Sequence, residues 1–279
     1  MTETRSPTHP YGELIATKVR VLTWNVWGRF GPWMEREAAL RATLTALQPD
    51  VIALQEAWRD PGGHDQAARL AKMLGYHGVY GGGTFLADDW GTGAALLSRW
   101  PIDQREYREF PATAPGRWGG AALFGRIAGP RGMLSAFSVA LDWPLYASAV
   151  RQASVRQLVS FVLEVAGPTF PTVICGDFNA SPDSDEIRML TGRSDTAAPG
   201  FALFDAWEMA GTGAGHTWAR GNPWAAPALL PDKRIDYILV GRPRRGGAGH
   251  VVGCAIAGTE PVAGIVPSDH YAVVADLRY

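Results

Sequence analysis

Five short apolar segments of this sequence each end in a carboxylate, amide or imidazole side chain. They are VLTWN with Asn25, VIALQE with Glu56, TVICGDFN with Asp177 and Asn179, RIDYIL with Asp236, and VPSDH with Asp269 and His270. Short, continuous apolar runs are typical of strands that are buried on both faces. Buried strands rarely end in carboxylates without a partner cation, so the pattern predicts buried sheets whose strand ends carry a polar cluster.

Helical and strand-like apolar periodicities alternate along the chain. Helices are predicted over residues 33–47, 65–74 and 147–166, and further strands around 93–99, 120–128, 133–141 and 271–277. Both halves follow a similar order, which predicts an α/β fold with two sheets packed face to face and helices outside. With 279 residues and 47% hydrophobic content, we predict a polar tail over 1–17 and a single domain over 18–279.

Charge and cysteine content narrow the partners. Lys and Arg number 26 against 27 Asp and Glu, giving a net charge of −1, so no overall cationic field would attract a polyanion. The arginines at 242, 244 and 245 are read as a solvated loop, and no strong general nucleic-acid patch is expected. Cys175 and Cys254 lack metal-ligand spacing and are expected to pack as small apolar residues.

The sequence contains no sign of export or of membrane insertion. The N-terminus has no basic start followed by an apolar core, and no stretch reaches 18 uninterrupted apolar residues. A cytoplasmic location is therefore expected. Nothing in the sequence indicates an oligomeric state.

The polar strand ends contain oxygen donors and imidazole but no thiolate, which suits a hard cation such as Mg²⁺. Each residue alone has a structural interpretation. Asn25 could cap a turn, Asp177 and Asn179 could form Asx-turns, and Asp236 could pair with Arg234. Five such strand ends in one chain favour a shared cation site over five separate structural roles.

The motifs WNV, LQE, GDFN, DYI and SDH, in this order between residues 19 and 277, resemble the endonuclease/exonuclease/phosphatase superfamily. This superfamily of Mg²⁺-dependent phosphoesterases includes deoxyribonuclease I, exonuclease III, inositol polyphosphate 5-phosphatases and neutral sphingomyelinases. The resemblance implies a deoxyribonuclease I-like fold, a four-layer α/β/β/α sandwich of two packed mixed sheets flanked by helices. LLSRWP and RQASVRQL also look like framework segments of the superfamily.

The resemblance also implies a metal site. Glu56 would be the principal ligand of Mg²⁺, or alternatively of Mn²⁺, with Asn25 beside it as a ligand or supporting group. Asp269 would serve the metal side of the site. A cation placed there would neutralise charge that develops on a phosphoryl group.

Four further residues take catalytic roles in the same comparison. Asp177 would orient and deprotonate the attacking water, and Asn179 would hold the water and the phosphate. His270 would bind a phosphoryl oxygen, with its ring fixed by Asp236. The other five histidines have no motif around them and are read as surface or turn residues.

Aromatic residues next to the motifs are candidate substrate contacts. Trp27, Trp58 and Trp143, together with Asp142, could stack on a base or line an apolar channel, although a large aromatic near a strand end is more often packed in a core. For Trp24 we favour core packing.

One strand departs from the superfamily pattern. SAFSVAL precedes Asp142, and where relatives carry a phosphate-binding histidine, in a pattern resembling THLDW, this chain has Ala140. Loss of one such donor typically costs about 10²–10³ in rate. Three explanations are open: an engineered substitution, a natural loss in a binding or regulatory protein, or replacement by Trp143 or an arginine. Because every other motif residue is intact, engineering is ranked first.

The leading interpretation is a Mg²⁺-dependent phosphoesterase that attacks a phosphodiester or phosphomonoester in line with water, present as a variant with reduced activity. A phosphorylated small molecule, a nucleotide or a short oligonucleotide fits the net charge of −1. The alternative from another class is a non-catalytic protein that binds an anionic phosphorylated ligand. A nuclease or sphingomyelinase-like activity is a further alternative.

Overall fold

The architecture consists of two six-stranded sheets, in a computed structural model that describes residues 10–115, 117–168 and 170–279. The first sheet contains, in spatial order, β11 (Val251–Ala257), β12 (Ala272–Arg278), β1 (Lys18–Asn25), β2 (Val51–Arg59), β4 (Trp90–Ser98) and β3 (His77–Ala87). The second contains β5 (Ile102–Glu109), β6 (Gly120–Gly129), β7 (Gly132–Leu141), β8 (Val173–Asp177), β10 (Asp236–Val240) and β9 (Phe204–Asp205).

Both sheets are mixed. Strand β1 runs parallel to β2, and β7 runs parallel to β8, whereas the other paired strands are antiparallel. The apolar inner faces of the two sheets form one core, in which Val21, Ala53 and Leu96 of the first sheet cluster with Leu123 and Cys175 of the second.

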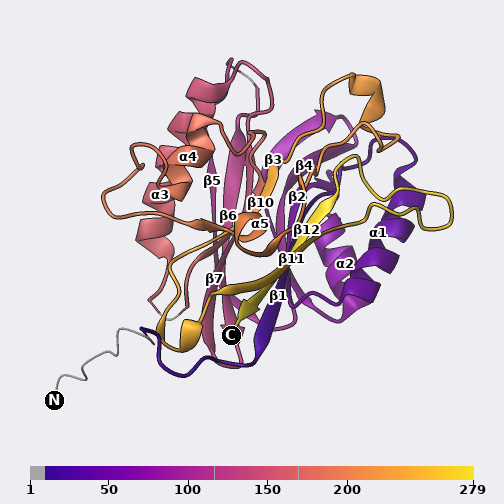
Figure 1. Cartoon of the computed structure of the whole chain (residues 1–279). Helices are drawn as coiled ribbons and strands as arrows, with labels where there is room; N and C mark the ends of the chain where they lie inside the picture. Colours follow the sequence, from indigo (N-terminus) through magenta and orange to yellow (C-terminus); the bar gives the residue numbers. More distant parts are fainter. Residues whose placement is uncertain (1–9, 116, 169) are drawn as a thin grey trace.

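Helices cover the outer faces and complete four layers (Figure 1). Leu40 and Leu44 of α1 (Trp33–Leu47) and Leu70 of α2 (Gln66–Leu74) pack on the first sheet. Helices α3 (Ser148–Val165) and α4 (Asp185–Thr191) cover the second sheet, where Leu158 and Phe161 are fully buried. Three short pieces complete the helical content: α5 (Ala206–Ala210), η1 (Ala226–Ala228) and η2 (Arg245–Gly247). The predicted α/β sandwich is confirmed.

Besides the two-residue strand β9, three strands are absent from the sequence prediction. Strand β3 holds a Gly-Gly-Gly run at 81–83, β5 is largely exposed and charged, and β11 alternates poorly between buried and exposed positions. All three lie at sheet edges, where one side of the strand needs no apolar partner and charge discourages unwanted pairing. Periodicity therefore gives little signal for them.

The predicted N-terminal tail falls partly outside the described residues, which begin at residue 10. From there to residue 17 the chain has no helix or strand, and it runs along η2. The backbone N–H of Ile15 donates to the Gly246 carbonyl, and the N–H of Gly246 donates to the Tyr11 carbonyl. In the part of the chain that the structure describes, no helix is both long and apolar enough to cross a membrane.

A buried polar link joins the sheets just behind the strand ends. The side-chain amide of Gln55 donates to Ser138 Oγ at 2.9 Å and accepts from Thr23 Oγ1 at 3.2 Å. The Ser138 hydroxyl donates to the Leu54 carbonyl at 2.8 Å. All three side chains are fully buried, and a satisfied buried network of this kind fixes β1, β2 and β7 relative to one another.

Candidate active site

The predicted polar residues converge where the two sheets meet. Asn25 ends β1, and its side-chain N–H groups donate to Glu56 Oε1 of the same sheet and to Asp177 Oδ2 of the other sheet, both at 3.0 Å. Asp177, the last residue of β8, lies opposite Asp236, the first residue of β10. One amide therefore bridges the two halves of the cluster.

Three residues around the cluster have left-handed backbone conformations that non-glycine residues rarely adopt. They are Trp27, Glu56 and Asn179, with φ values of 55°, 55° and 50°. Glu56 sits in a bulge of β2, where the pairing with β4 shifts between Leu54 and Ala57. A bulge re-aims a side chain, and such conformations cost of order 1–3 kcal/mol each. They concentrate here at the site.

His270 is held by Asp236. Its Nδ1 lies 2.9 Å from Asp236 Oδ2, while Nε2 faces Asp177 Oδ2 at 3.8 Å. Arg234 pairs instead with Asp205 at 2.5 Å, so the alternative interpretation of Asp236 as the partner of Arg234 is wrong. The Trp218 ring contacts the imidazole edge-on, with ring centroids 5.0 Å apart.

The charges in the cluster perturb one another. Burial, together with Asp236, raises the pKa of Asp177 to about 7, although His270 and Asn25 oppose the shift. Burial also raises the pKa of Asp269 to about 7, against the effect of His270. Burial lowers the pKa of His270, but the surrounding carboxylates outweigh it and raise that pKa well above its usual value. Perturbation of this kind, by burial and specific charges, is typical of functional sites.

Carboxylates outnumber cationic groups in this cluster, which fits a divalent cation. Burial raises the pKa of Glu56, and the charges of Asp177 and Asp236 add to the shift. Glu56, Asn25 and Asp269 offer only oxygen ligands, the donors that Mg²⁺ prefers. Repulsion between these carboxylates favours their protonated forms. A doubly charged cation beside them would offset that repulsion.

A second grouping of ligand atoms lies on the other side of the cluster. One ligand atom each of Asp177, Asp236 and His270 falls within 4.8 Å of the other two. Nδ1 of His270 is already bonded to Asp236, and that bond orients the ring. The trio could hold a metal ion through these atoms, with the imidazole oriented by Asp236.

Several residues that the sequence analysis did not identify support the site. The Asn222 amide donates to the carbonyls of Ser268 and Asp269, at 2.8 and 3.0 Å, and the Ser268 hydroxyl donates to the Asn25 carbonyl at 2.7 Å. Arg36 donates to carbonyls on both loops that flank the cluster. These contacts run to backbone atoms, for which the sequence contains no motif.

Arg151 holds the loop that follows β7. It is buried, pairs with Glu186 of α4 at 2.5 Å, and donates to the carbonyls of Asp142 and Pro144. It lies within RQASVRQL, which the sequence analysis identified only as framework. The resemblance of RQASVRQL to a framework segment is therefore the sequence feature that points to Arg151.

The candidate substrate contacts divide into buried and exposed groups. Trp58 is 2% exposed, lies under the Arg29 guanidinium at 4.0 Å and donates to Glu37, an environment that favours core packing over a substrate contact. Trp24 is fully buried and donates to the His270 carbonyl. Trp143 is 65% exposed.

Trp27 and Asp142 both contact neighbouring residues of the protein. Trp27 is partly buried and packs between Phe30 and Trp224, each with ring centroids at 5.8 Å. Asp142 is 1% exposed, and its Oδ2 accepts from the Thr113 backbone N–H at 3.0 Å. Asp142 therefore anchors the loop after β5 to the end of β7.

Ala140 lies beside the central carboxylate. It is the register partner of Asp177 between the parallel strands β7 and β8, and the side-chain amide of Asn179 donates to the next carbonyl, that of Leu141, at 2.9 Å. The position thus lies beside the cluster, as the resemblance of this strand to the superfamily pattern implies.

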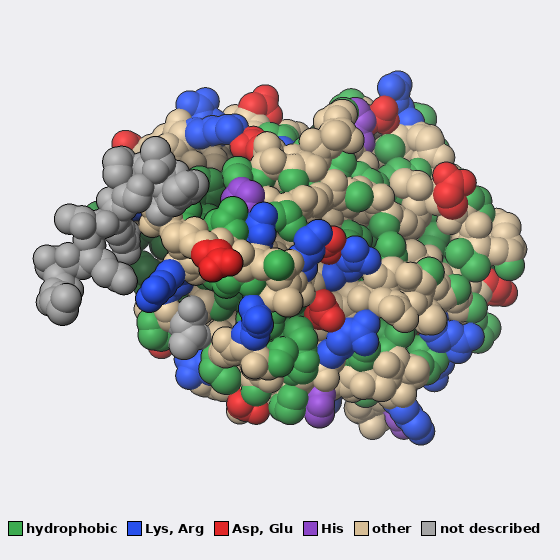
Figure 2. Space-filling model, turned by 60° about the horizontal axis from the view of Figure 1, so that its bottom comes forward, with side chains coloured by type: hydrophobic (Ala, Val, Ile, Leu, Met, Phe, Trp, Pro, Cys, Tyr) green, Lys and Arg blue, Asp and Glu red, His purple; other side chains and the backbone are tan. Residues whose placement is uncertain are grey.

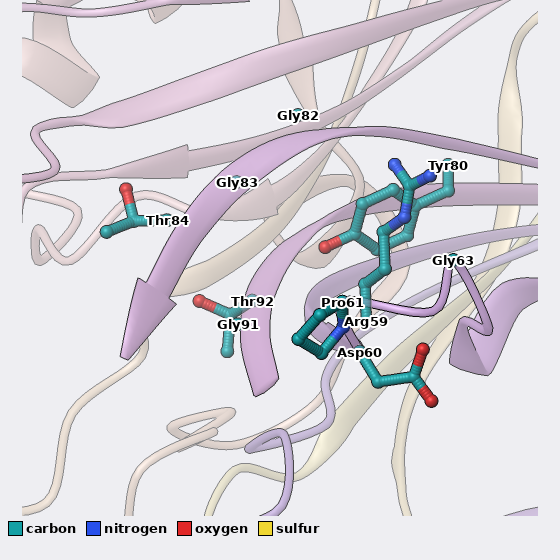
Figure 3. Close-up of a pocket in the computed structure, with 10 residues that line it drawn as sticks. All are labelled: Arg59, Asp60, Pro61, Gly63, Tyr80, Gly82, Gly83, Thr84, Gly91 and Thr92. Carbon is teal, nitrogen blue, oxygen red and sulfur yellow. The ribbon is translucent and has the colours of Figure 1, made fainter. Parts of the chain in front are cut away.

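A pocket lies further along β2 from the cluster (Figure 3). It is lined by Arg59 and Asp60 after Glu56, by Tyr80 and the glycines of β3, and by Thr92 of β4, and encloses about 330 Å³. The Arg59 guanidinium lies 5.6 Å from the Tyr80 ring centroid.

Two facing mixed sheets with outer helices and this acidic cluster define a deoxyribonuclease I-like α/β sandwich. The sequence model of the Endonuclease/Exonuclease/phosphatase family matches residues 22–270, and the chain belongs to that family. No curated protein matches it in sequence. Members of the family generally use divalent metals, and the cluster provides acidic and imidazole groups for one.

Solved structures share the fold. TDP2 from D. rerio, complexed with a single-stranded DNA product, is 20% identical with a TM-score of 0.73, over 94% of this chain and 100% of that chain. An endonuclease/exonuclease/phosphatase from Beutenbergia cavernae is 25% identical with a TM-score of 0.72, over 94% and 71%. One from Bacteroides vulgatus is 21% identical with a TM-score of 0.70, over 94% and 98%.

Proposed function

We propose that this chain is a Mg²⁺-dependent phosphoesterase that hydrolyses a phosphodiester or phosphomonoester by in-line attack of water. The observation that carries the proposal is the environment of Asp177. Its two oxygens accept from the Asn179 backbone N–H at 2.9 Å and the Asn25 amide at 3.0 Å, and the His270 ring faces it. A carboxylate pinned in this way, with its pKa raised to about 7, suits general-base chemistry at neutral pH.

Each residue then has a defined task. Asp177 takes the proton of the attacking water, and the Asn179 amide, already within 3.3 Å of Asp177, orients water and phosphate. His270 is held as an imidazolium by Asp236 and donates from Nε2 to a phosphoryl oxygen. Glu56, Asn25 and Asp269 would hold Mg²⁺, or Mn²⁺, which when bound would supply charge compensation at the phosphoryl group.

The substrate is proposed to be a nucleotide, a short oligonucleotide or another phosphorylated small molecule. The single-stranded DNA product bound to the TDP2 structure supports a nucleic-acid fragment, and the pocket lined by Arg59 and Tyr80 offers an aromatic face and a cation beyond the cluster. The net charge of −1 disfavours long polyanions. On the face drawn in Figure 2, basic side chains are interspersed with acidic ones.

A non-catalytic role is the rival proposal, and Ala140 is the observation that favours it. Without a donor at that position, turnover is expected to fall by about 10²–10³, whether the substitution was engineered or natural. A binding protein would retain the fold and bind the phosphorylated ligand at the same cluster, but it would not hydrolyse it.

The test is turnover of a phosphoester panel, comprising dinucleotides, nucleoside monophosphates, sugar phosphates and choline phosphodiesters, with and without Mg²⁺. Hydrolysis that requires the cation and is abolished in Asp177→Asn supports the phosphoesterase. Asp183→Asn, which changes a carboxylate outside the cluster, serves as the matched control. Binding of a phosphate ester without hydrolysis, in the wild type and in Ala140→His alike, would establish the rival.

A further inference from the structure

The loop between β5 and β6 brings an arginine to the strand end where Ala140 stands. Arg117 Nη2 lies 3.8 Å from Oδ1 of Asp142, two residues beyond Ala140. The Arg117 side chain is 35% exposed, whereas that of Asp142 is fully buried. Within the described chain this is the ion pair that Asp142 forms.

Ala140 lies beside the cluster, and Asp142 follows two residues later, directly after β7 ends at Leu141. Ala140 is the register partner of Asp177. Between Ala140 and Asp142, the Leu141 carbonyl accepts from the Asn179 amide at 2.9 Å. The Arg117–Asp142 pair and the Asn179–Leu141 hydrogen bond therefore lie at the same strand end as Ala140.

The guanidinium is held in place but keeps its donors free. It lies over the exposed Trp143 ring at 5.2 Å from the centroid, and among the described residues its N–H groups make no hydrogen bond. Asp142 Oδ1 is buried and likewise has no hydrogen-bond partner there. An arginine oriented by a ring and a carboxylate, with an unused fork of donors, matches the geometry of phosphoryl oxygens.

Resting on the proposed phosphoesterase function, we propose that Arg117 is a catalytic residue that contacts the scissile phosphate in place of the donor that Ala140 lacks. This favours replacement over an engineered or natural loss. In the step itself, the water oxygen forms the new P–O bond, Asp177 takes the water proton, and the bond from phosphorus to the leaving oxygen breaks. Arg117 neither gives nor takes a proton, so the leaving oxygen takes its proton from solvent.

This role predicts a distinctive set of variants, assayed on bis(4-nitrophenyl) phosphate with Mg²⁺. Arg117→Gln is expected to lower kcat by about 10²–10³, while Ala140→His changes the wild-type rate by less than about tenfold because the contact already exists. In the Arg117→Gln background, Ala140→His should recover at least about tenfold and introduce an imidazole limb in the pH profile. Arg108→Gln is the matched control, since Arg108 is 34% exposed and pairs with Glu164.

Several outcomes would overturn the inference. Arg117→Gln within about threefold of the wild type would do so, as would a large gain from Ala140→His alone, and that second result would leave the phosphoesterase function intact. If Arg117→Gln fails to fold in thermal melts, Arg117→Lys keeps the charge beside Asp142 but lacks the fork, and an unchanged kcat in that variant would count against the role. If the wild type and Ala140→His both lack turnover, the phosphoesterase proposal fails. In that case the affinity for inorganic phosphate is measured by calorimetry. The same affinity in the wild type and in Arg117→Gln would refute the contact between Arg117 and the phosphate.

Discussion

Arg36 tests how the loops around the site are held in place. This side chain of α1 is 2% exposed, and it donates six hydrogen bonds of 2.8–3.1 Å to five backbone carbonyls. Four of the carbonyls belong to residues 26–30, directly after Asn25. The fifth belongs to Pro267, two residues before Asp269. One guanidinium therefore fastens both loops that present proposed cation ligands.

We predict that Arg36→Met lowers the free energy of unfolding by about 3–5 kcal/mol. A hydrogen bond to a charged group contributes about 1.5–3 kcal/mol, but six bonds from one side chain do not add, and loop carbonyls partly regain water. Burial also lowers the pKa of Arg36 to about 10, so desolvation offsets part of the gain. Losses when a buried charged partner is removed are typically about 3–5 kcal/mol.

Urea unfolding followed by circular dichroism measures this loss, and titration calorimetry of the folded variant measures Mg²⁺ affinity. We expect the affinity to weaken as well, since both ligand loops lose their anchor. Arg41→Met is the control, because Arg41 lies on the exposed side of the same helix and, among the described residues, its side chain donates a hydrogen bond only to Met73 Sδ. An Arg36→Met protein within about 1 kcal/mol of the wild type would refute the reasoning.

Three further predictions follow from the cluster. Glu56→Gln should keep the unfolding midpoint but weaken Mg²⁺ binding at least about tenfold and lower activity with it, because the cation loses a charged ligand. Calorimetry measures the binding and turnover measures the activity, and unchanged Mg²⁺ binding would exclude Glu56 as a ligand. In the metal-free protein, the free energy of unfolding should fall as pH rises from about 4 to about 7. Burial raises the pKa values of Asp177 and Asp269 to about 7, so the folded state holds protons that the unfolded state has already released. Thermal melts across this pH range test the sign, and a rise in stability would contradict it. Asp236→Asn should shift the alkaline limb of the kcat/KM profile to lower pH, because Asp236 is the carboxylate with the largest effect in raising the pKa of His270 against burial. An unchanged limb would show that it reports the titration of another group.

Part of the cluster could be predicted because three of its residues sit at the ends of strongly apolar strands, whereas Glu56 lies in a bulge within β2 and Asp269 and His270 lie in the loop before β12, where a strand end was expected. Asn25, Asp177 and Asp236 occupy strand ends as expected, and strand ends are readable from hydrophobic periodicity. Arg36 and Asn222 could not be predicted, since they act on backbone carbonyls up to 231 residues away in sequence. Contacts between distant loops depend on packing that no local pattern encodes.

Trp58 shows how little proximity to a motif says about the environment of a side chain. It follows Glu56 by two residues, and proximity to a motif suggested a substrate contact. Alternation along β2 is broken by the bulge after Leu54, and the Trp58 ring is covered by Arg29 and Trp33. A bulge changes which face a later residue occupies, so sequence spacing alone does not place this side chain.

The position of the cluster between two sheets explains why its geometry depends on sheet register. The first sheet carries Glu56 and the second carries Asp177, and Asn25 donates to both. A slide of one sheet against the other would pull that amide from one of its acceptors and leave a buried carboxylate unpaired, which is costly. The Gln55–Ser138 hydrogen bond lies one residue behind Glu56 and opposes such a slide. This polar link inside an apolar core therefore contributes to the alignment of the site as well as to stability, because apolar side chains alone would pack nearly as well in a shifted register.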